Sequence, residues 1–269
     1  MKKVLLHIAL LAAAVVALVP LVWMVSASLM PTGEANTFPP RFFPSRVTFE
    51  HYTALFTGLD LGRYVLNSTL VALGGTVTAL LVTSMAGYAL AKLRFRGRDL
   101  TSKLLLAALV VPAQVTMLPL FLELKQMGLV NTYLGVLIPY MAPVYGIFLI
   151  RQYALSIPDD LLDAARIDGA GEFLIYRTVV LPVIAPALAT LAIFTFLGTW
   201  NDFMWPLIIL SDDARHTLPV ALARLSGEHV QDTELMMAGS VITVLPVFVT
   251  FVVLQRYYIQ GIMVGSLKG

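Results

Sequence analysis

The sequence contains no cysteine, which excludes disulfide bonds, thiol nucleophiles and thiolate metal sites. Charged residues are also scarce, because Asp, Glu, Lys and Arg make up only 13% of the 269 residues while 58% are hydrophobic. So few charged side chains do not cover the surface of a water-soluble globule of this length. The composition therefore indicates a protein embedded in a lipid bilayer.

Nucleotide-binding and catalytic motifs are missing as well. No G-x-x-x-x-G-K-[ST] segment occurs, so the chain has no P-loop, and if ATP is used, another subunit hydrolyses it. The four histidines, His7, His51, His216 and His229, form neither an HExxH motif nor an i,i+4 ligand pair. No paired-carboxylate or Ser/His/Asp arrangement suggests catalysis. We expect a non-enzymatic chain that holds no cofactor and no metal of its own.

Long runs without Asp, Glu, Lys or Arg are what the sequence does contain. A hydrocarbon core of about 30 Å requires roughly 20 apolar residues in a helix. Backbone groups in lipid must pair internally, and segments of alternating barrel type are absent, so the runs are expected to be helices. We predict an all-α integral membrane protein, a single transmembrane domain over residues 1–269, with six transmembrane helices at Val4–Gly33, Tyr64–Ala91, Leu104–Leu122, Gln126–Ile150, Thr178–Asn201 and Leu235–Gln255.

The basic residues are divided unevenly between the two sides of this predicted bundle. Six spans place both termini on one side, which carries twelve Lys and Arg residues against six on the other. The positive-inside rule then predicts that both termini are cytoplasmic. Lys2 and Lys3 before an apolar run resemble a signal peptide, but the run is longer than an ordinary h-region, so we expect it to be retained. The excess positive charge suits an inner membrane and does not indicate nucleic acid.

The first external loop, Met30–Gly62, mixes prolines with aromatic residues. The prolines bar regular helix in its first half, whereas the segment FEHYTALF is expected to form a short interfacial helix. Two interpretations are open for this loop. It is either a lid over the helix bundle or a surface for an extracytoplasmic partner, since loops carry recognition more often than scaffolds do.

A cytoplasmic loop, residues 153–182, is far more polar than the spans on either side. It contains the stretch DDLLDAARIDGAGEFLIYRTVVLP, which holds seven charged residues. Pro158 and the two acidic residues after it suit a helix start, and Gly169 suits a left-handed stop. We predict a short helix over about Asp159–Asp168 and a second helical stretch over Glu172–Val180. On physical grounds, the segment is either a polar connector or a knob that docks into a partner.

One charged residue lies within the fifth predicted span and its continuation. Asp202 is flanked by Trp200, Asn201 and Trp205. An intramembrane carboxylate normally faces a cavity or a partner, and aromatic rings beside hydrogen-bonding groups suit a sugar. Alternatively, the tryptophans belong to the interfacial belt and Asp202 hydrogen-bonds a neighbouring helix. Lining of a translocation pathway and a structural polar contact therefore both remain open for these four residues.

Several segments resemble the permeases of ABC importers, in particular the carbohydrate, maltose-type branch. DAARIDGAGEFLIYRTVVLP resembles their EAA loop, with Asp163, Ala164, Ala165 and Gly169 at the E-A-A and glycine positions. The resemblance is closest to the smaller six-span subunit of the permease pair. Asp163 stands where the family usually has glutamate, which keeps the carboxylate on a shorter arm. Further matching segments cover nearly the whole chain: GLVNTYLG, FLIRQY, PALATLAIFTFLGTWNDFMWPL, TLPVAL and GIMVGSLKG.

This resemblance implies a type I ABC importer fold with a cytoplasmic coupling helix in loop 153–182. It implies that a partner ATPase, which binds ATP and Mg, contacts the residues Asp163, Ala164, Ala165, Arg166, Asp168 and Gly169. Residues 256–269 would form a cytoplasmic tail that also reaches toward the ATPase. Two ATPase subunits, a second permease in a heterodimer and an extracytoplasmic sugar-binding protein are the implied partners. The expected function is inward transport of a sugar, a di- or oligosaccharide, across a bacterial or archaeal inner membrane.

Other classes of membrane protein would show different sequence patterns. An ABC permease for a non-sugar or sugar-phosphate solute is the nearest alternative. A secondary transporter should show ionisable residues or broken helices in both halves of an internal repeat, whereas this sequence has one intramembrane carboxylate and no clear repeat. A membrane enzyme should gather a nucleophile or metal ligands, and the sequence gathers neither.

Overall fold

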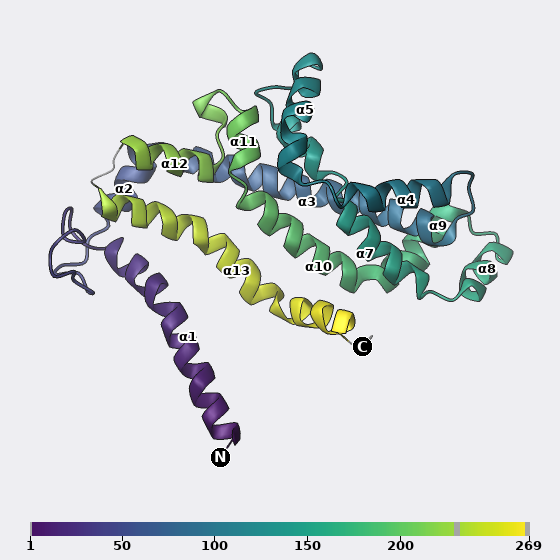
Figure 1. Cartoon of the computed structure of the whole chain (residues 1–269), viewed down its shortest axis with the longest axis horizontal. Helices are drawn as coiled ribbons and strands as arrows, with labels where there is room; N and C mark the ends of the chain where they lie inside the picture. Colours follow the sequence, from purple (N-terminus) through teal and green to yellow (C-terminus); the bar gives the residue numbers. More distant parts are fainter. Residues whose placement is uncertain (1, 229–231, 267–269) are drawn as a thin grey trace. The chain divides into compact units, whose positions relative to one another are not determined.

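The computed structural model describes the backbone of residues 2–228 and 232–266, and the side chains of these residues except 226, 228 and 254–266. Within these described ranges the chain is helical and contains no strand (Figure 1). The predicted tail, residues 256–269, lies outside the part whose side chains are described. The chain divides into two compact units, Met1–Leu66 with Thr217–Phe248, and Asn67–His216 with Val249–Gly269.

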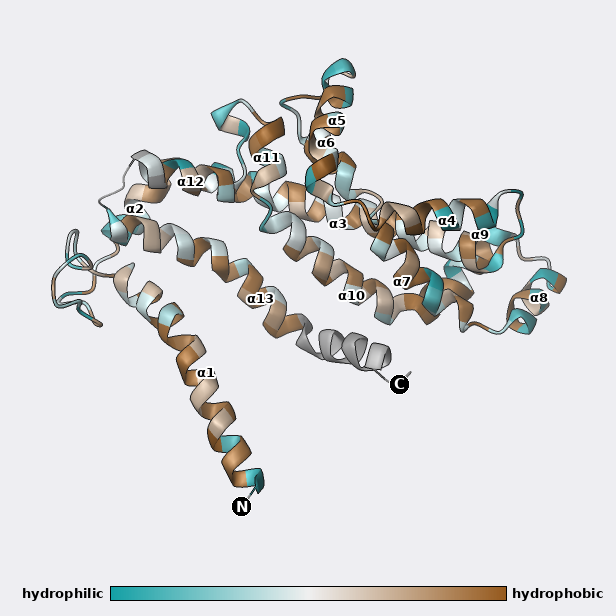
Figure 2. Cartoon of the chain, viewed as in Figure 1, coloured by the Kyte–Doolittle hydropathy of each residue, from teal (hydrophilic) through white to brown (hydrophobic). Residues whose placement is uncertain are grey.

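Four helices are long and apolar enough to cross a membrane. They are α1 (Lys2–Ala27), α3 (Leu61–Lys92), the continuous stretch Glu172–Trp200, and residues Thr233–Val253 of α13 (Thr233–Ser266). Two bent helix pairs raise this number to as many as six if each pair is one span. Figure 2 shows the hydrophobic residues distributed along these helices. The prediction of an all-α membrane protein is therefore confirmed.

Two of the predicted spans are interrupted in the structure. The run Leu104–Leu122 is divided between α4 (Arg98–Ala108) and α5 (Ala113–Gln126), which meet at 110°. Pro112 stands directly before α5. Proline has no N–H to donate and disfavours helical geometry in the residue before it, so the helix ends there and restarts in a new direction.

The run Gln126–Ile150 is interrupted in the same way. It contains α6 (Tyr133–Leu137), the 3₁₀ turn η1 (Ile138–Tyr140) and α7 (Val144–Leu155), with a bend of 44° before α7. Pro143 directly precedes α7. Prolines thus decide the shape of both interrupted spans.

Close helix packing in the unit Asn67–His216 depends on glycine. A Cβ on Gly87 of α3 would lie 2.7 Å from the side chain of Ile150 on α7. A Cβ on Gly146 of α7 would lie 2.9 Å from Leu191 on α10 (Leu181–Trp200). These contacts are shorter than carbon atoms tolerate, so both helix pairs approach as they do because the side chains are absent. Their shared core is apolar and includes Tyr88, Ile150, Ile184 and Leu191.

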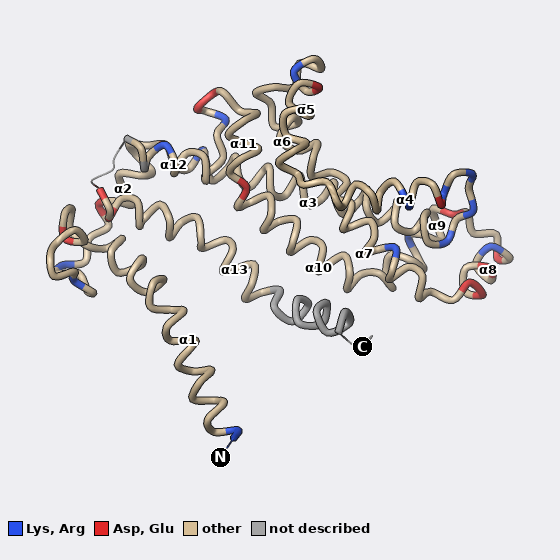
Figure 3. Tube along the Cα trace, viewed as in Figure 1, with Lys and Arg blue, Asp and Glu red and all other residues tan. Residues whose placement is uncertain are grey.

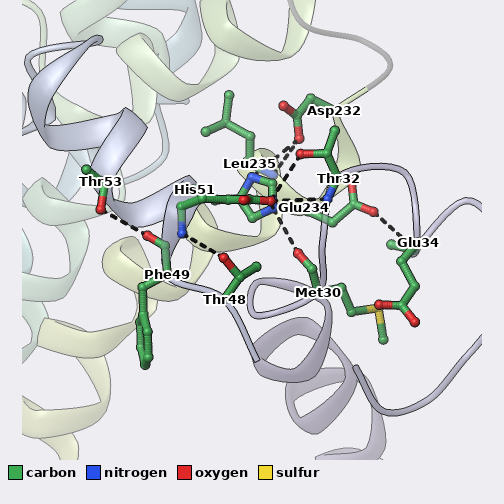
Figure 4. A network of polar contacts seen from close by, with 12 residues as sticks. Met30, Thr32, Glu34, Thr48, Phe49, His51, Thr53, Asp232, Glu234 and Leu235 are labelled. Carbon is green, nitrogen blue, oxygen red and sulfur yellow. Dashed lines mark hydrogen bonds and ion pairs between the residues drawn. The ribbon is translucent and has the colours of Figure 1, made fainter. Parts of the chain in front are cut away.

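The unit Met1–Leu66 with Thr217–Phe248 contains α1, the short helix α2 (Glu50–Thr57), α12 (Leu218–Glu228) and the first part of α13. The short helix predicted in the first external loop is thereby confirmed. The loop before it is held by polar contacts (Figure 4). The buried carboxylate of Glu234 accepts a 2.7 Å hydrogen bond from the amide of Ala35, and His51 Nε2 lies 2.9 Å from the carbonyl of Met30.

Candidate functional site

The polar loop between α7 and α10 forms a helical hairpin. Its first helix, α8 (Asp159–Ile167), begins directly after Pro158 and has two aspartates in its first turn, which favour the positive end of the helix dipole. Gly169 follows with φ of +85°, a conformation that favours glycine. α9 (Glu172–Ile175) then leads through the π turn η2 (Tyr176–Val180) into α10. Both predicted helical stretches are confirmed, the first ending one residue earlier than expected.

One side of α8 is packed and the other is open. Leu162 is buried in the core cluster, and Ala165 packs against that cluster. Leu161 and Ala164 are exposed one turn apart, and Ile167 is 87% exposed at the end of the helix. Leu161, Ala164 and Ala165 stand at i, i+3 and i+4 and so share one face of the helix, and of these the structure leaves the first two open. This exposed strip, Leu161, Ala164 and Ile167, is small and apolar.

Arg166 connects the two arms of the hairpin. Its guanidinium donates to Asp163 at 2.7 Å and to Glu172 at 2.8 Å. The second carboxylate oxygen of Glu172 accepts a 2.7 Å hydrogen bond from the hydroxyl of Tyr88 on α3. We call this chain, Asp163, Arg166, Glu172 and Tyr88, the brace. It connects α8 through α9 to a membrane-crossing helix.

A second contact holds the start of α8. Lys92, the last residue of α3, donates 2.6 Å hydrogen bonds to the carboxylate of Asp159 and to the carbonyl of Ile157. The hydrogen bond from Lys92 and its charge hold the pKa of Asp159 below the ordinary value. Hydrogen bonds to Glu172 and Asp163 raise the pKa of Arg166 above its already high value, so it stays charged. The first residue of each arm, Asp159 in α8 and Glu172 in α9, is thus fixed to α3 by a charge-assisted hydrogen bond.

An open cleft of about 980 Å³ lies beside the hairpin. Figure 3 shows charged residues of both signs gathered near α8, α9 and α4. The cleft is lined by Lys92, Arg94, Arg98, Arg166, Asp159, Asp163 and Glu172, among others. Such mixed charge fits the surface of a protein partner better than a single small ion.

The four candidate pathway residues do not line one surface. Trp200 is 2% exposed and stacks on Phe196 with ring centroids 5.9 Å apart. Trp205 is 3% exposed and its indole N–H donates to the carbonyl of Gly135 at 3.2 Å. Asn201 is exposed, although its amide donates to the carbonyl of Leu197 at 2.8 Å. Both tryptophans therefore pack within the chain, and of the four only Asn201 and Asp202 are open to any degree.

Asp202 has a partner from another helix. The hydroxyl of Tyr140, at the end of η1, donates to its carboxylate, and the amide of Met204 donates to the other oxygen at 3.1 Å. A neighbouring cavity of about 290 Å³ between α7 and α10 is lined by Tyr140, Tyr145, Phe194, Thr195 and Thr199, among others. These contacts match the structural alternative for Asp202. The aromatic and hydroxyl groups of the cavity provide a second surface on which a pathway can be sought.

Sequence reasoning missed the residues that complete these sites. Tyr88 and Lys92 lie 84 and 67 positions before their partners, and Tyr140 lies 62 positions before Asp202. No local spacing relates residues so far apart. Only the packing of α3 against the hairpin, and of η1 near the end of α10, brings them together.

The described residues thus combine helices long enough to cross a membrane with a braced polar hairpin. The chain belongs to the family of binding-protein-dependent transport system inner membrane components, whose model matches residues 75–264. The matched residues include the hairpin and the two helices, Leu181–Trp200 and Met204–Ile209, that contain the buried residues Trp200 and Trp205. The chain is therefore a membrane protein with the fold of a type I ABC importer permease.

Particular relatives extend the similarity beyond the family region. The arabinooligosaccharides transport system permease protein AraQ of Halalkalibacterium halodurans is 39% identical over 259 residues, 95% of this chain and 93% of that protein. The diacetylchitobiose uptake system permease protein NgcG of Streptomyces coelicolor is 33% identical over 266 residues, 97% of this chain and 88% of that protein. A solved bacterial ABC transporter involved in the import of the acidic polysaccharide alginate matches with a TM-score of 0.86, 25% identity and 96% of both chains covered.

Proposed function

We propose that this chain is the permease subunit of an ATP-driven importer that moves a sugar, a di- or oligosaccharide, into the cell. The hairpin is the observation that carries this proposal. A polar element that is fixed to α3 and exposes a small apolar strip suits contact with a protein partner in water better than contact with lipid. Membership of a binding-protein-dependent transport family supports the direction of transport. Relatives named for arabinooligosaccharide and diacetylchitobiose transport support the class of solute.

The proposed docking element is α8. Its strip of Leu161, Ala164 and Ile167 offers close approach and apolar contact to an ATPase surface, with Asp163, Arg166 and Asp168 beside it for orientation. Movement of the ATPase would push on α8, and the brace would pass that movement to α3. A rigid connection is required, because a hinged helix would absorb the displacement instead of shifting the permease between its two states.

The remaining partners follow from the same scheme. A second permease would complete the pathway as a heterodimer, two cytoplasmic ATPase subunits would bind ATP and Mg, and an extracytoplasmic binding protein would deliver the sugar. Both termini of this chain would be cytoplasmic, which places the hairpin on the side of the ATPase. The chain itself would transport without catalysing a reaction.

Reconstitution of the assembled transporter tests the proposal. Proteoliposomes are prepared with this chain, the second permease, the ATPase and the binding protein. They should take up labelled arabinooligosaccharide or diacetylchitobiose only when ATP is present on the side of the membrane that the ATPase faces. Omission of this chain should abolish uptake. ATP-dependent uptake of a polyol or sugar phosphate, with no uptake of either oligosaccharide, would retain the importer and overturn the class of solute.

A further inference from the structure

The loop between α1 and α2 carries four exposed phenylalanine rings. We call Phe38, Phe42, Phe43 and Phe49 the aromatic patch, and their exposed fractions are 97%, 43%, 72% and 65%. The rings of Phe42 and Phe43 contact one another edge to face, with centroids 5.7 Å apart. Large apolar side chains exposed on one short loop are candidates for a site of interaction.

The loop holds this patch in a defined position. The carboxylate of Glu34 is buried and accepts a 3.1 Å hydrogen bond from the amide of Ser45 and a 2.9 Å hydrogen bond from the guanidinium of Arg41. The carboxylate of Glu234, which is labelled in Figure 4, accepts a hydrogen bond from the amide of Ala35, the residue next to Glu34. A loop folded around two buried carboxylates presents its outer side chains from a fixed backbone.

The same loop is attached to the last turns of α1. The hydroxyl of Ser26 donates to the carbonyl of Phe42 at 2.6 Å, and the indole N–H of Trp23 donates to the carbonyl of Arg41 at 3.3 Å. α1 is a candidate span with exposed hydrophobic side chains along its length. The loop that carries the aromatic patch is therefore attached to the end of a candidate membrane span, where we expect the hydrocarbon core to meet the headgroups.

The backbone limits how deeply the patch can enter. Residues 38–49 lie outside regular helix, and unpaired backbone N–H and C=O groups are not tolerated in hydrocarbon. The rings can enter the interface while the backbone remains among hydrated headgroups. Arg46 is exposed in the same segment and supplies positive charge opposite lipid phosphates, whereas the charge of Arg41 is paired with Glu34.

We propose that the aromatic patch is a membrane anchor that inserts into the headgroup region at the end of α1. We assign the lipid surface as its occupant, because hydrogen bonds attach the loop directly to α1, and the side chains of α1 are apolar and exposed. Aromatic and basic side chains at this depth set the tilt and depth of a helix. The anchor requires only that α1 crosses the membrane, so it does not depend on the solute that is transported.

Spin labels test the depth of the patch directly. Because the chain has no cysteine, Phe38→Cys or Phe43→Cys introduces one labelling position into it, with the cysteines of the partner subunits replaced. The assembled transporter is placed in lipid nanodiscs, and collision of the label with oxygen, which partitions into lipid, is compared with collision with a water-soluble nickel chelate. We expect oxygen to dominate several-fold at both positions.

Ser211→Cys is the matched control, because Ser211 is exposed in the polar loop between α11 (Met204–Ile209) and η3 (Asp213–Arg215). We expect the nickel chelate to dominate there. Nickel-dominated collision at positions 38 and 43 would overturn the anchor. Nickel access that disappears only when the binding protein is added would also overturn it, and would assign the aromatic patch to that protein instead.

Discussion

The hydroxyl of Tyr88 and the carboxylate of Glu172 lie 2.7 Å apart and join α3 to the start of α9. Arg166 holds the opposite oxygen of the same carboxylate at 2.8 Å, so displacement of α8 reaches a membrane-crossing helix through two hydrogen bonds. Both bonds involve charged groups, which makes them stronger than neutral ones. The brace thus provides a short mechanical path between the proposed docking helix and the bundle.

Removal of the Tyr88 hydroxyl should loosen this path. A hydrogen bond to a charged group contributes about 1.5–3 kcal/mol, and each 1.4 kcal/mol corresponds to about tenfold in an equilibrium. We expect Tyr88→Phe to lower uptake by about tenfold or more while ATP hydrolysis persists, measured together in proteoliposomes. Tyr153→Phe is the control, since that hydroxyl of α7 is outside the brace. Equal loss of uptake and hydrolysis in Tyr88→Phe would contradict mechanical coupling through the brace.

The exposed strip of α8 should be sensitive to bulk and charge. Ala164→Glu places a carboxylate where the ATPase is proposed to make close contact, and an unpaired charge at such a contact is costly. We expect at least about a tenfold loss of uptake, without loss of the folded subunit, because Ala164 is exposed in the isolated chain. Ala164→Ser keeps the side chain small and should transport normally. Normal uptake by Ala164→Glu would remove Ala164 from the docking surface.

The contact between α3 and α7 should not accept a methyl group at Gly87. The added Cβ would meet Ile150 at 2.7 Å and the backbone nitrogen of Arg151 at 3.0 Å. Overpacking of this kind costs about 1–3 kcal/mol, so the thermal unfolding temperature of Gly87→Ala should fall. Gly198→Ala is the control, because no atom lies within 4 Å of its added Cβ. A similar change in both variants would show that helix propensity, and not packing, is responsible.

The loop that carries the aromatic patch should weaken in acid. Burial of Glu34 works to raise its pKa, but hydrogen bonds from Ser45 and Arg41 outweigh burial and hold the pKa below its ordinary value near 4.5. The resulting stabilisation is therefore present above that value and is lost as the pH falls through the lower folded pKa. We expect hydrogen exchange at the Ser45 amide, corrected for the intrinsic rate, to accelerate in that acidic window.

Glu34→Gln separates this titration from general acid unfolding. The amide cannot ionise, so exchange at Ser45 should already be faster at neutral pH and should lose most of its dependence on acid. Protection that declines identically in both proteins would place the titrating group elsewhere in the loop.

Tyr140 and Asp202 should behave as a structural pair. Removal of the hydroxyl in Tyr140→Phe leaves the carboxylate without its partner from η1, a change that costs about 1–3 kcal/mol. We expect a lower unfolding temperature with an unchanged KM for the sugar. Intact stability with a raised KM would assign the pair, Tyr140 with Asp202, to the translocation pathway instead.

Local signals in the sequence predicted the helices but not their connections. Pro158 and Gly169 mark the ends of α8 because caps depend on neighbouring residues, and apolar runs predicted the membrane helices. The lengths of the apolar runs do not reveal the bends at Pro112 and Pro143. The inward packing of Trp200 and Trp205, and the partners Tyr88 and Tyr140, depend on contacts between distant segments, which no local pattern encodes.

Crosslinking from α8 tests the central claim most directly. Because the chain has no cysteine, Ala164→Cys provides a unique position in it for a short photoactivatable crosslinker in native membranes. We predict a crosslinked product with a P-loop ATPase, identified by mass spectrometry, from Ala164→Cys and none from Ser211→Cys. Absence of the ATPase from the Ala164→Cys product, with crosslinks only to lipid or to a second copy of this chain, would contradict the role of α8 as the docking helix.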